Sequence, residues 1–134
     1  MSLIVPDVGE IQLLNLLRLA WSPTIRLFTN PVTIGPSSVA ADFLEATFPG
    51  YAAVLSSGWT FPTSEATGRA ATSANQVLFT RASNGSPAQI YGYFVTDGMG
   101  NLLWAETDPN GPVPFNGAGN EYRVVPRFTL KSEF

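Results

Sequence analysis

Residues 89–106 read QIYGYFVTDGMGNLLWAE and contain the clearest fold signal in the chain. The first eight of them, 89–96, are rich in aromatic and β-branched residues, which is typical of a strand. Residues 102–106 have the same apolar, strand-like character. Between the two runs, 97–101 (DGMGN) consists of residues that favour tight turns, several of them tolerant of a positive φ. The stretch therefore predicts an antiparallel β-hairpin.

Shorter runs of similar character lie on both sides of this hairpin, at 25–29, 51–56, 76–82, 121–125 and 127–130. Turn residues such as Pro, Gly, Asn and Asp separate them, and Pro126 suits a bend or an edge between the last two. The segment 59–74 shows no clear strand pattern, and 41–48 favours a short helical turn with Phe43, Leu44 and Phe48 facing inward. Six to eight short strands at this spacing predict a mainly β fold, a small antiparallel β-sandwich or flattened barrel over residues 25–130.

One α-helix is expected in front of the strands, over residues 7–21. Asp7 and Glu10 have the D-x-x-E spacing of a capping box, and Pro23 follows the expected end of the helix. Residues 1–6 would form an extended arm before it. The chain of 134 residues then forms one domain, 1–134, with a single N-terminal helix.

The expected helix is apolar on nearly every side. At 100° per residue its widest apolar face, expected to point inward, consists of Leu13, Leu16, Leu17 and Ala20, with Leu14 and Trp21 at the edge. The helix either covers an open end of the β-domain or shares its second face with another subunit. In the second case, the arm and the outer face make contacts with another subunit or a partner protein through Leu3, Ile4, Val5, Pro6, Val8, Ile11, Gln12, Asn15 and Leu19.

Composition excludes several classes of function. The chain has no cysteine and no histidine, so thiolate metal sites, disulfides and histidine-based catalytic triads are impossible. A net charge of −3 with scattered cations argues against a nucleic-acid partner. The longest apolar stretch, 13–21, is too short to span a bilayer, and no secretory signal is visible, so we expect no membrane partner.

The side chains that could carry chemistry look structural. The acidic candidates for paired catalysis are Asp42, Glu45, Asp97, Glu106, Asp108 and Glu121, and most fall in expected turns or strand ends. We therefore expect no catalytic residue, no cofactor, no metal site and no enzymatic activity. A sugar-binding platform would need an exposed cluster from Tyr51, Trp59, Tyr91 or Trp104, and strand alternation places Tyr91 and Tyr93 opposite Phe94.

Several segments resemble a family of small virion proteins of tailed bacteriophages, cyanophages among them. The resemblance extends over nearly the whole chain and is carried by LIVPDVGE (3–10) with the following leucine-rich helix, LFTN (27–30), ADF (41–43), FPGY (48–51), GYFVTD (92–97), LWAE (103–106) and PRFTL (126–130). These motifs contain packing and turn residues rather than reactive groups.

The resemblance implies a capsid decoration, or cement, protein. Its partner would be the major capsid protein, and its location the capsid surface of the virion, after assembly in the host cytoplasm. Such a protein is expected to form a homo-oligomer, a dimer or a trimer. The alternative is a carbohydrate- or receptor-binding β-module of a phage tail or fibre.

Overall fold

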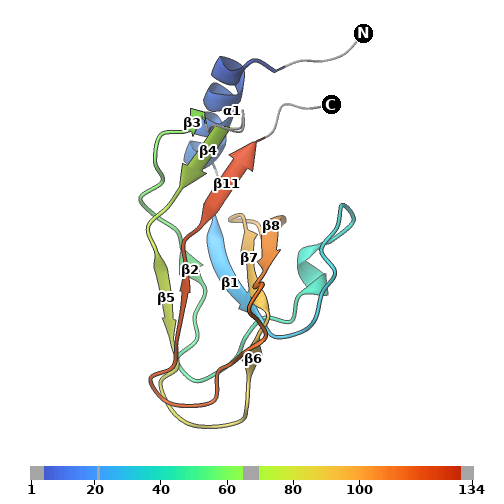
Figure 1. Cartoon of the computed structure of the whole chain (residues 1–134), viewed down its shortest axis with the longest axis vertical. Helices are drawn as coiled ribbons and strands as arrows, with labels where there is room; N and C mark the ends of the chain where they lie inside the picture. The colour runs from blue at the N-terminus through green and yellow to red at the C-terminus, as the bar shows by residue number, and fades with distance from the viewer. Residues whose placement is uncertain (1–4, 21, 65–69, 131–134) are drawn as a thin grey trace.

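The computed structural model describes residues 5–20, 22–64 and 70–130. It is mainly β, with one N-terminal helix and several small antiparallel sheets, as the sequence predicts. The molecule is elongated: a β-body lies at one end, and helix α1 (Asp7–Ala20) lies at the other end beside strands β3, β4 and β11 (Figure 1). We call this second end the helix lobe.

The largest sheet of the β-body has four antiparallel strands in the order β2-β1-β7-β8. Their bounds are β1 Thr24–Phe28, β2 Val54–Leu55, β7 Gly92–Thr96 and β8 Leu102–Thr107. The predicted hairpin is confirmed, since β7 pairs with β8 and Asp97 and Asn101 close the turn through a 3.0 Å backbone hydrogen bond. Gly100 has φ +86°, which glycine adopts without strain.

A long two-stranded ribbon connects the β-body to the helix lobe. Its lower half pairs β5 with β10 and its upper half pairs β4 with β11, with β3 added at the edge of β4. The bounds are β3 Thr63–Ser64, β4 Ala70–Ser73, β5 Val77–Thr80, β10 Glu121–Val124 and β11 Arg127–Leu130. The pairing is interrupted between Val124 and Arg127, where the carbonyl of Pro126 accepts a hydrogen bond from the amide of Ala74. The ribbon changes direction at this point (Figure 1), as expected for the bend at Pro126.

The main core lies between the four-stranded sheet and the lower half of the ribbon. Ile25 and Leu27 of β1 face Val77 and Phe79 of β5 in this cluster. The opposite face of the sheet carries a smaller cluster of Phe28, Phe43 and Phe94, beneath the loop that contains the 3-10 helix η1 (Ala40–Asp42). The sheet is therefore covered on both faces, and among the side chains that the structure describes neither cluster of buried residues includes one from α1.

Three local expectations are wrong. The strand expected over 89–96 divides into β6 (Gln89–Ile90), which pairs with β9 (Val113–Pro114), and β7. Gly92 lies at the break, against the backbone of Glu106, and Tyr91 consequently packs against the same cluster as Phe94 rather than opposite it. Leu44, expected to face inward, is 62% exposed, whereas Phe43 and Phe48 are buried as expected. Strand β4 lies in a segment where no strand was expected.

Candidate interaction surface on the N-terminal helix

Helix α1 begins at Asp7, one residue after Pro6, whose carbonyl accepts the first helical hydrogen bond from the amide of Glu10 at 2.9 Å. The helix expected over 7–21 is observed from Asp7 to Ala20, and residue 21 lies outside the described part of the chain. The expected capping box is wrong, because the Glu10 carboxylate does not turn back to the start of the helix. It points toward β4 instead.

The inner face of α1 is narrow. Among the helix side chains that the structure describes, Leu14 and Glu10 are buried, each only 1% exposed. Glu10 Oε2 accepts a hydrogen bond from the backbone amide of Ala70 in β4 at 3.2 Å, and Glu10 Oε1 is buried with no hydrogen-bond partner. Burying a carboxylate oxygen without a hydrogen bond costs free energy, so the contact of Glu10 with the ribbon stabilises the position of α1 less than a fully hydrogen-bonded carboxylate would.

The outer face of α1 carries large apolar side chains in solvent. Val8 is 72% exposed, Leu16 63% and Leu13 47%, and Gln12 is also exposed. The expectation that Leu13 and Leu16 face inward is therefore wrong. Because Glu10 occupies the inner face, the helix is rotated relative to the expected orientation, and Leu14 rather than Leu13 and Leu16 meets the ribbon.

The residues predicted to make contacts fall into three groups. Val8, Gln12 and Pro6 are exposed, whereas Val5, Ile11 and Asn15 are half-buried. Leu3 and Ile4, and the side chain of Leu19, lie outside the described part of the chain. The structure thus brings Val8 and Gln12 onto one surface with Leu13 and Leu16, which the helical pattern had assigned to the interior.

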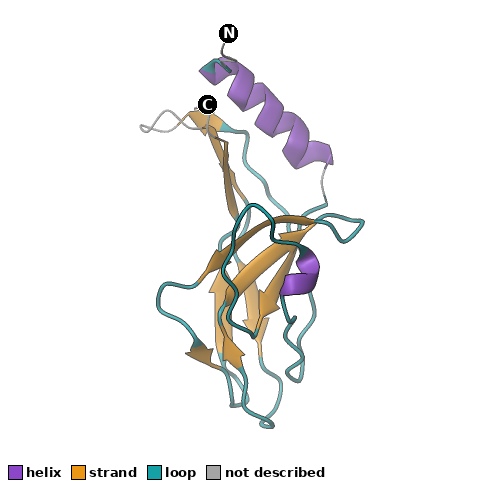
Figure 2. Ribbon diagram, turned by 90° about the vertical axis from the view of Figure 1, so that its right-hand side faces the viewer, coloured by secondary structure: helices purple, strands orange, loops and turns teal. Residues whose placement is uncertain are grey.

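Helix α1 packs on the end of the ribbon, over a strand that offers mainly small side chains. Figure 2 shows α1 lying across the tip of the ribbon, above the β-body rather than against it. The strand beneath it, β4, presents mainly small residues, among them Ala70 and Ala71. A 14-residue helix is marginally stable alone, so a second layer of packing on its outer face would stabilise it.

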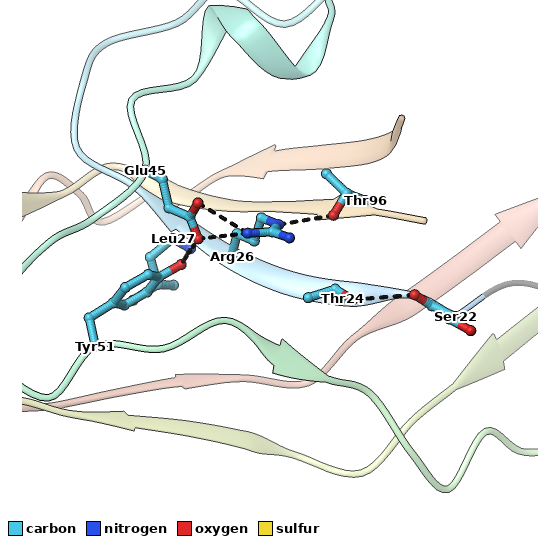
Figure 3. A network of polar contacts seen from close by, with 7 residues as sticks. All are labelled: Ser22, Thr24, Arg26, Leu27, Glu45, Tyr51 and Thr96. Carbon is cyan, nitrogen blue, oxygen red and sulfur yellow. Dashed lines mark hydrogen bonds and ion pairs between the residues drawn. The ribbon is translucent and has the colours of Figure 1, made fainter. Parts of the chain in front are cut away.

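Elsewhere, the acidic residues considered for chemistry are engaged in structural contacts. Glu45 accepts from two side chains: Arg26 Nη1 donates to both of its carboxylate oxygens at 3.1 Å, and the Tyr51 hydroxyl donates to Oε2 at 2.6 Å (Figure 3). The same hydroxyl accepts the amide of Leu27 at 3.2 Å, and Arg26 Nε donates to the hydroxyl of Thr96. Burial, followed by the hydrogen bond to Glu45, raises the pKa of Tyr51 above its ordinary 10.0.

Two further acids pair with tyrosines. The Tyr122 hydroxyl donates to Asp108 at 2.7 Å, and the negative charge of Glu106 acts on Tyr93. Burial, with these carboxylates, raises the pKa of both phenols. The remaining acids bind residues close to them in sequence. Asp42 accepts a hydrogen bond from the amide of Val39, Asp97 accepts hydrogen bonds from the amides of Met99 and Asn101, and Glu121 forms an ion pair with Arg123. Within the described residues, acidic side chains form no group of three or more that could hold a metal ion.

The aromatic residues proposed for sugar binding do not form one exposed cluster. Tyr51 stacks on Phe79 in the main core, and Tyr91 packs against the smaller cluster on the other face of the sheet. Trp59 and Trp104 contact each other edge to face, with ring centroids 6.1 Å apart. All four side chains are half-buried. The arrangement gives them packing roles.

Sequence reasoning missed the role of Arg81. It is only 1% exposed and donates hydrogen bonds to the carbonyl oxygens of Ser83, Ser86 and Phe115. It thereby ties together two loops that are distant in sequence, next to a groove of about 660 Å³. A lone arginine in a turn-rich segment gives no sequence signal for such a role.

Comparison with known proteins gives no relative. The chain matches no family model, and no curated protein or solved structure is significantly similar to it. Among the described residues, no helix has the length and apolar character needed to cross a bilayer.

Proposed function

We propose that this chain is a non-enzymatic structural protein of a tailed-phage virion, which binds the assembled capsid shell and stabilises it. The observation that carries the proposal is the outer face of α1, where Val8, Leu13 and Leu16 expose apolar surface at one end of an elongated molecule. Grouped apolar side chains in solvent are typical of a surface that contacts another protein. The resemblance of the sequence to small virion proteins supplies the phage context.

The charge and the described polar groups are consistent with a binding role. Charged residues make up only 13% of the chain, which suits contact surfaces that are covered on assembly. The acids that were considered for chemistry instead support turns, loops and tyrosine hydroxyls. The proposed partner is the major capsid protein, through the arm and the helix lobe.

A shell-stability assay tests the proposal. A decoration protein that binds the assembled shell and not the free subunit shifts the equilibrium toward assembly. Added protein should therefore raise the temperature at which expanded shells fall apart, with the effect saturating once the sites are filled. A variant lacking residues 2–6 should need a higher concentration for the same effect. An unchanged dissociation temperature at saturating protein would remove the proposal.

The alternative, a carbohydrate- or receptor-binding module of a tail or fibre, is tested with the same sample. A glycan that bound beside Trp59 and Trp104 would change tryptophan fluorescence in a saturable way. We expect no such change, because both rings are half-buried and in contact with each other.

A further inference from the structure

The groove beside Arg81 lies in the β-body, away from the surface used in the proposed function. Its volume is about 660 Å³, within the range of about 300–1,000 Å³ that is typical of pockets for small ligands. Gln89 in its wall belongs to strand β6, which lies at the end of the molecule far from helix α1 (Figure 1). The groove therefore has room for a ligand of monosaccharide size, and a protein bound to the helix lobe would not cover it.

Arg81 gives the groove a positive charge that the chain does not neutralise. Among the described residues that line the groove, Arg81 is the only charged one, and no acid lies with it. The ion pairs of the described part of the chain join Arg26 to Glu45 and Arg123 to Glu121, and neither includes Arg81. A buried cation without a counter-charge is unfavourable, so an anion in the groove would be stabilised by it.

The hydrogen bonds of Arg81 offset only part of this cost. Three of the five N–H groups of the guanidinium donate to the carbonyl oxygens of Ser83, Ser86 and Phe115. The other two, one on Nη1 and one on Nη2, have no acceptor among the described residues. Neutral carbonyl dipoles leave the full unit charge in place.

The charge of Arg81 reaches the groove through an apolar wall. The side chain is only 1% exposed, so it attracts a ligand mainly by its field rather than by a broad contact surface. Phe48, Pro49 and Pro87 line the same groove and keep water away from the guanidinium. Because screening is weak in such surroundings, the attraction of an anion is stronger there than at an open surface.

Neutral polar groups surround this charge. The side chains of Thr47, Ser86 and Gln89 line the groove, are exposed, and make no hydrogen bond within the described part of the chain. Two hydroxyls and one amide supply both donors and acceptors to the hydroxyl groups of a ligand. The half-buried ring of Tyr91 adds an aromatic surface, which suits contact with a sugar ring.

We propose that this groove binds a sugar that carries a carboxylate, with the carboxylate attracted by Arg81 and the sugar hydroxyls bound by Thr47, Ser86 and Gln89. A single positive charge matches a single carboxylate, and the neutral groups around it match hydroxyls. The inference goes beyond the proposed function and does not rest on it. We expect dissociation in the millimolar range, which is usual for a ligand of about 13 non-hydrogen atoms such as glucuronate.

A titration of the isotope-labelled full chain, followed by two-dimensional ¹H–¹⁵N NMR at low ionic strength, tests the proposal with three probes. Glucuronate should shift the amide signals of Ala88 and Gln89 and the Nε–H signal of Arg81 in a saturable way. Glucose, which lacks the carboxylate, and acetate, which lacks the hydroxyls, should each bind at least about tenfold more weakly. Glucose as tight as glucuronate would overturn the role of Arg81, and acetate as tight as glucuronate would overturn the recognition of a sugar.

A matched pair of variants shows whether binding occurs in this groove. Substitution of Arg81 would remove three loop hydrogen bonds, so the charge is changed at Gln89 instead. Gln76, directly before strand β5, is also an exposed glutamine but does not line the groove. Gln89→Glu should raise the dissociation constant for glucuronate at least about fivefold, because it places a like charge beside the carboxylate, and Gln89→Lys should lower it.

Gln76→Glu makes the same change in net charge and should leave the dissociation constant unchanged. Circular dichroism shows whether each variant is folded. Equal effects of Gln76→Glu and Gln89→Glu, or no saturable shift with about 50 mM glucuronate, would overturn the inference. Shell binding is measured separately, so glucuronate binding without shell binding retains the inference and removes the proposed function, and the reverse result removes only the inference.

Discussion

The hydroxyl of Tyr51 accepts the backbone amide of Leu27 just beyond the end of the β1–β2 pairing, and its removal gives the sharpest test of how the β-body is held together. Strand β2 pairs with β1 only at Thr24 and Ile25. Beyond that point the amide of Leu27 donates to the Tyr51 hydroxyl at 3.2 Å, and this hydroxyl donates to Glu45 at 2.6 Å (Figure 3). Tyr51→Phe removes both hydrogen bonds and leaves the ring in the core.

The expected cost follows from these two bonds. The bond to the Glu45 carboxylate is worth about 1.5–3 kcal/mol, as for other hydrogen bonds to charged groups. Leu27 is fully buried, so its amide would be left without an acceptor, at about 1–3 kcal/mol. Allowing for partial relaxation, we expect a loss of about 3 kcal/mol in the free energy of unfolding, which corresponds to roughly 10 °C in Tm for a chain of this size.

Urea denaturation followed by tryptophan fluorescence measures this loss. The matched control is Tyr122→Phe, which removes a similar bond, from Tyr122 to Asp108 at 2.7 Å, without exposing a buried amide. We expect the control to lose about 1.5 kcal/mol, the low end of the range for a hydrogen bond to a charged group. Equal losses for the two variants, or a loss below about 1 kcal/mol for Tyr51→Phe, would refute the role assigned to the Leu27 amide.

Three more predictions concern single features of the structure. Glu10→Gln removes a buried charge while keeping an acceptor for the Ala70 amide, so we expect it to stabilise the chain by about 1 kcal/mol in thermal unfolding, and a lower Tm would contradict the description of Glu10. Gly92→Ala places a Cβ against the carbonyl oxygen of Glu106, and we expect little folded protein by circular dichroism; a folded variant of normal Tm would contradict the close approach of β7 and β8. Alkaline pH should destabilise the fold, because a phenol whose pKa is raised on folding contributes stability that is present below pH 10 and is lost as the pH rises further. The urea midpoint should therefore fall above pH 10, with the loss reduced in Tyr51→Phe, and a constant midpoint would contradict the raised pKa values of Tyr51, Tyr93 and Tyr122.

The hairpin and the bend at Pro126 were predictable because local sequence determines them. The turn at 97–101 needs residues that accept tight backbone geometry, and Gly100 provides a positive φ within it. Proline cannot donate a ladder hydrogen bond, so its position between two strand-like runs indicates a break in pairing. Both signals lie within a few residues of the structure that they specify.

The orientation of α1 and the existence of β4 depend on distant partners. Leucine occupies positions on several sides of the helix, so periodicity alone does not select the inner face, and a glutamate is normally assigned to solvent. The burial of Glu10 is decided by the amide of Ala70, sixty residues away. Strand β4, with the sequence AATS, has few residues of high strand propensity and is formed by pairing with β11 near the end of the chain.

Co-sedimentation with capsid shells tests the central claim most directly. Purified protein is mixed with expanded shells of the tailed phage that the proposed function assigns as its source, and unexpanded precursor shells serve as the control. The account predicts saturable binding to expanded shells, at a fixed ratio to the major capsid protein, and none to the precursor. Failure to sediment with either kind of shell would contradict the claim that this protein decorates the capsid.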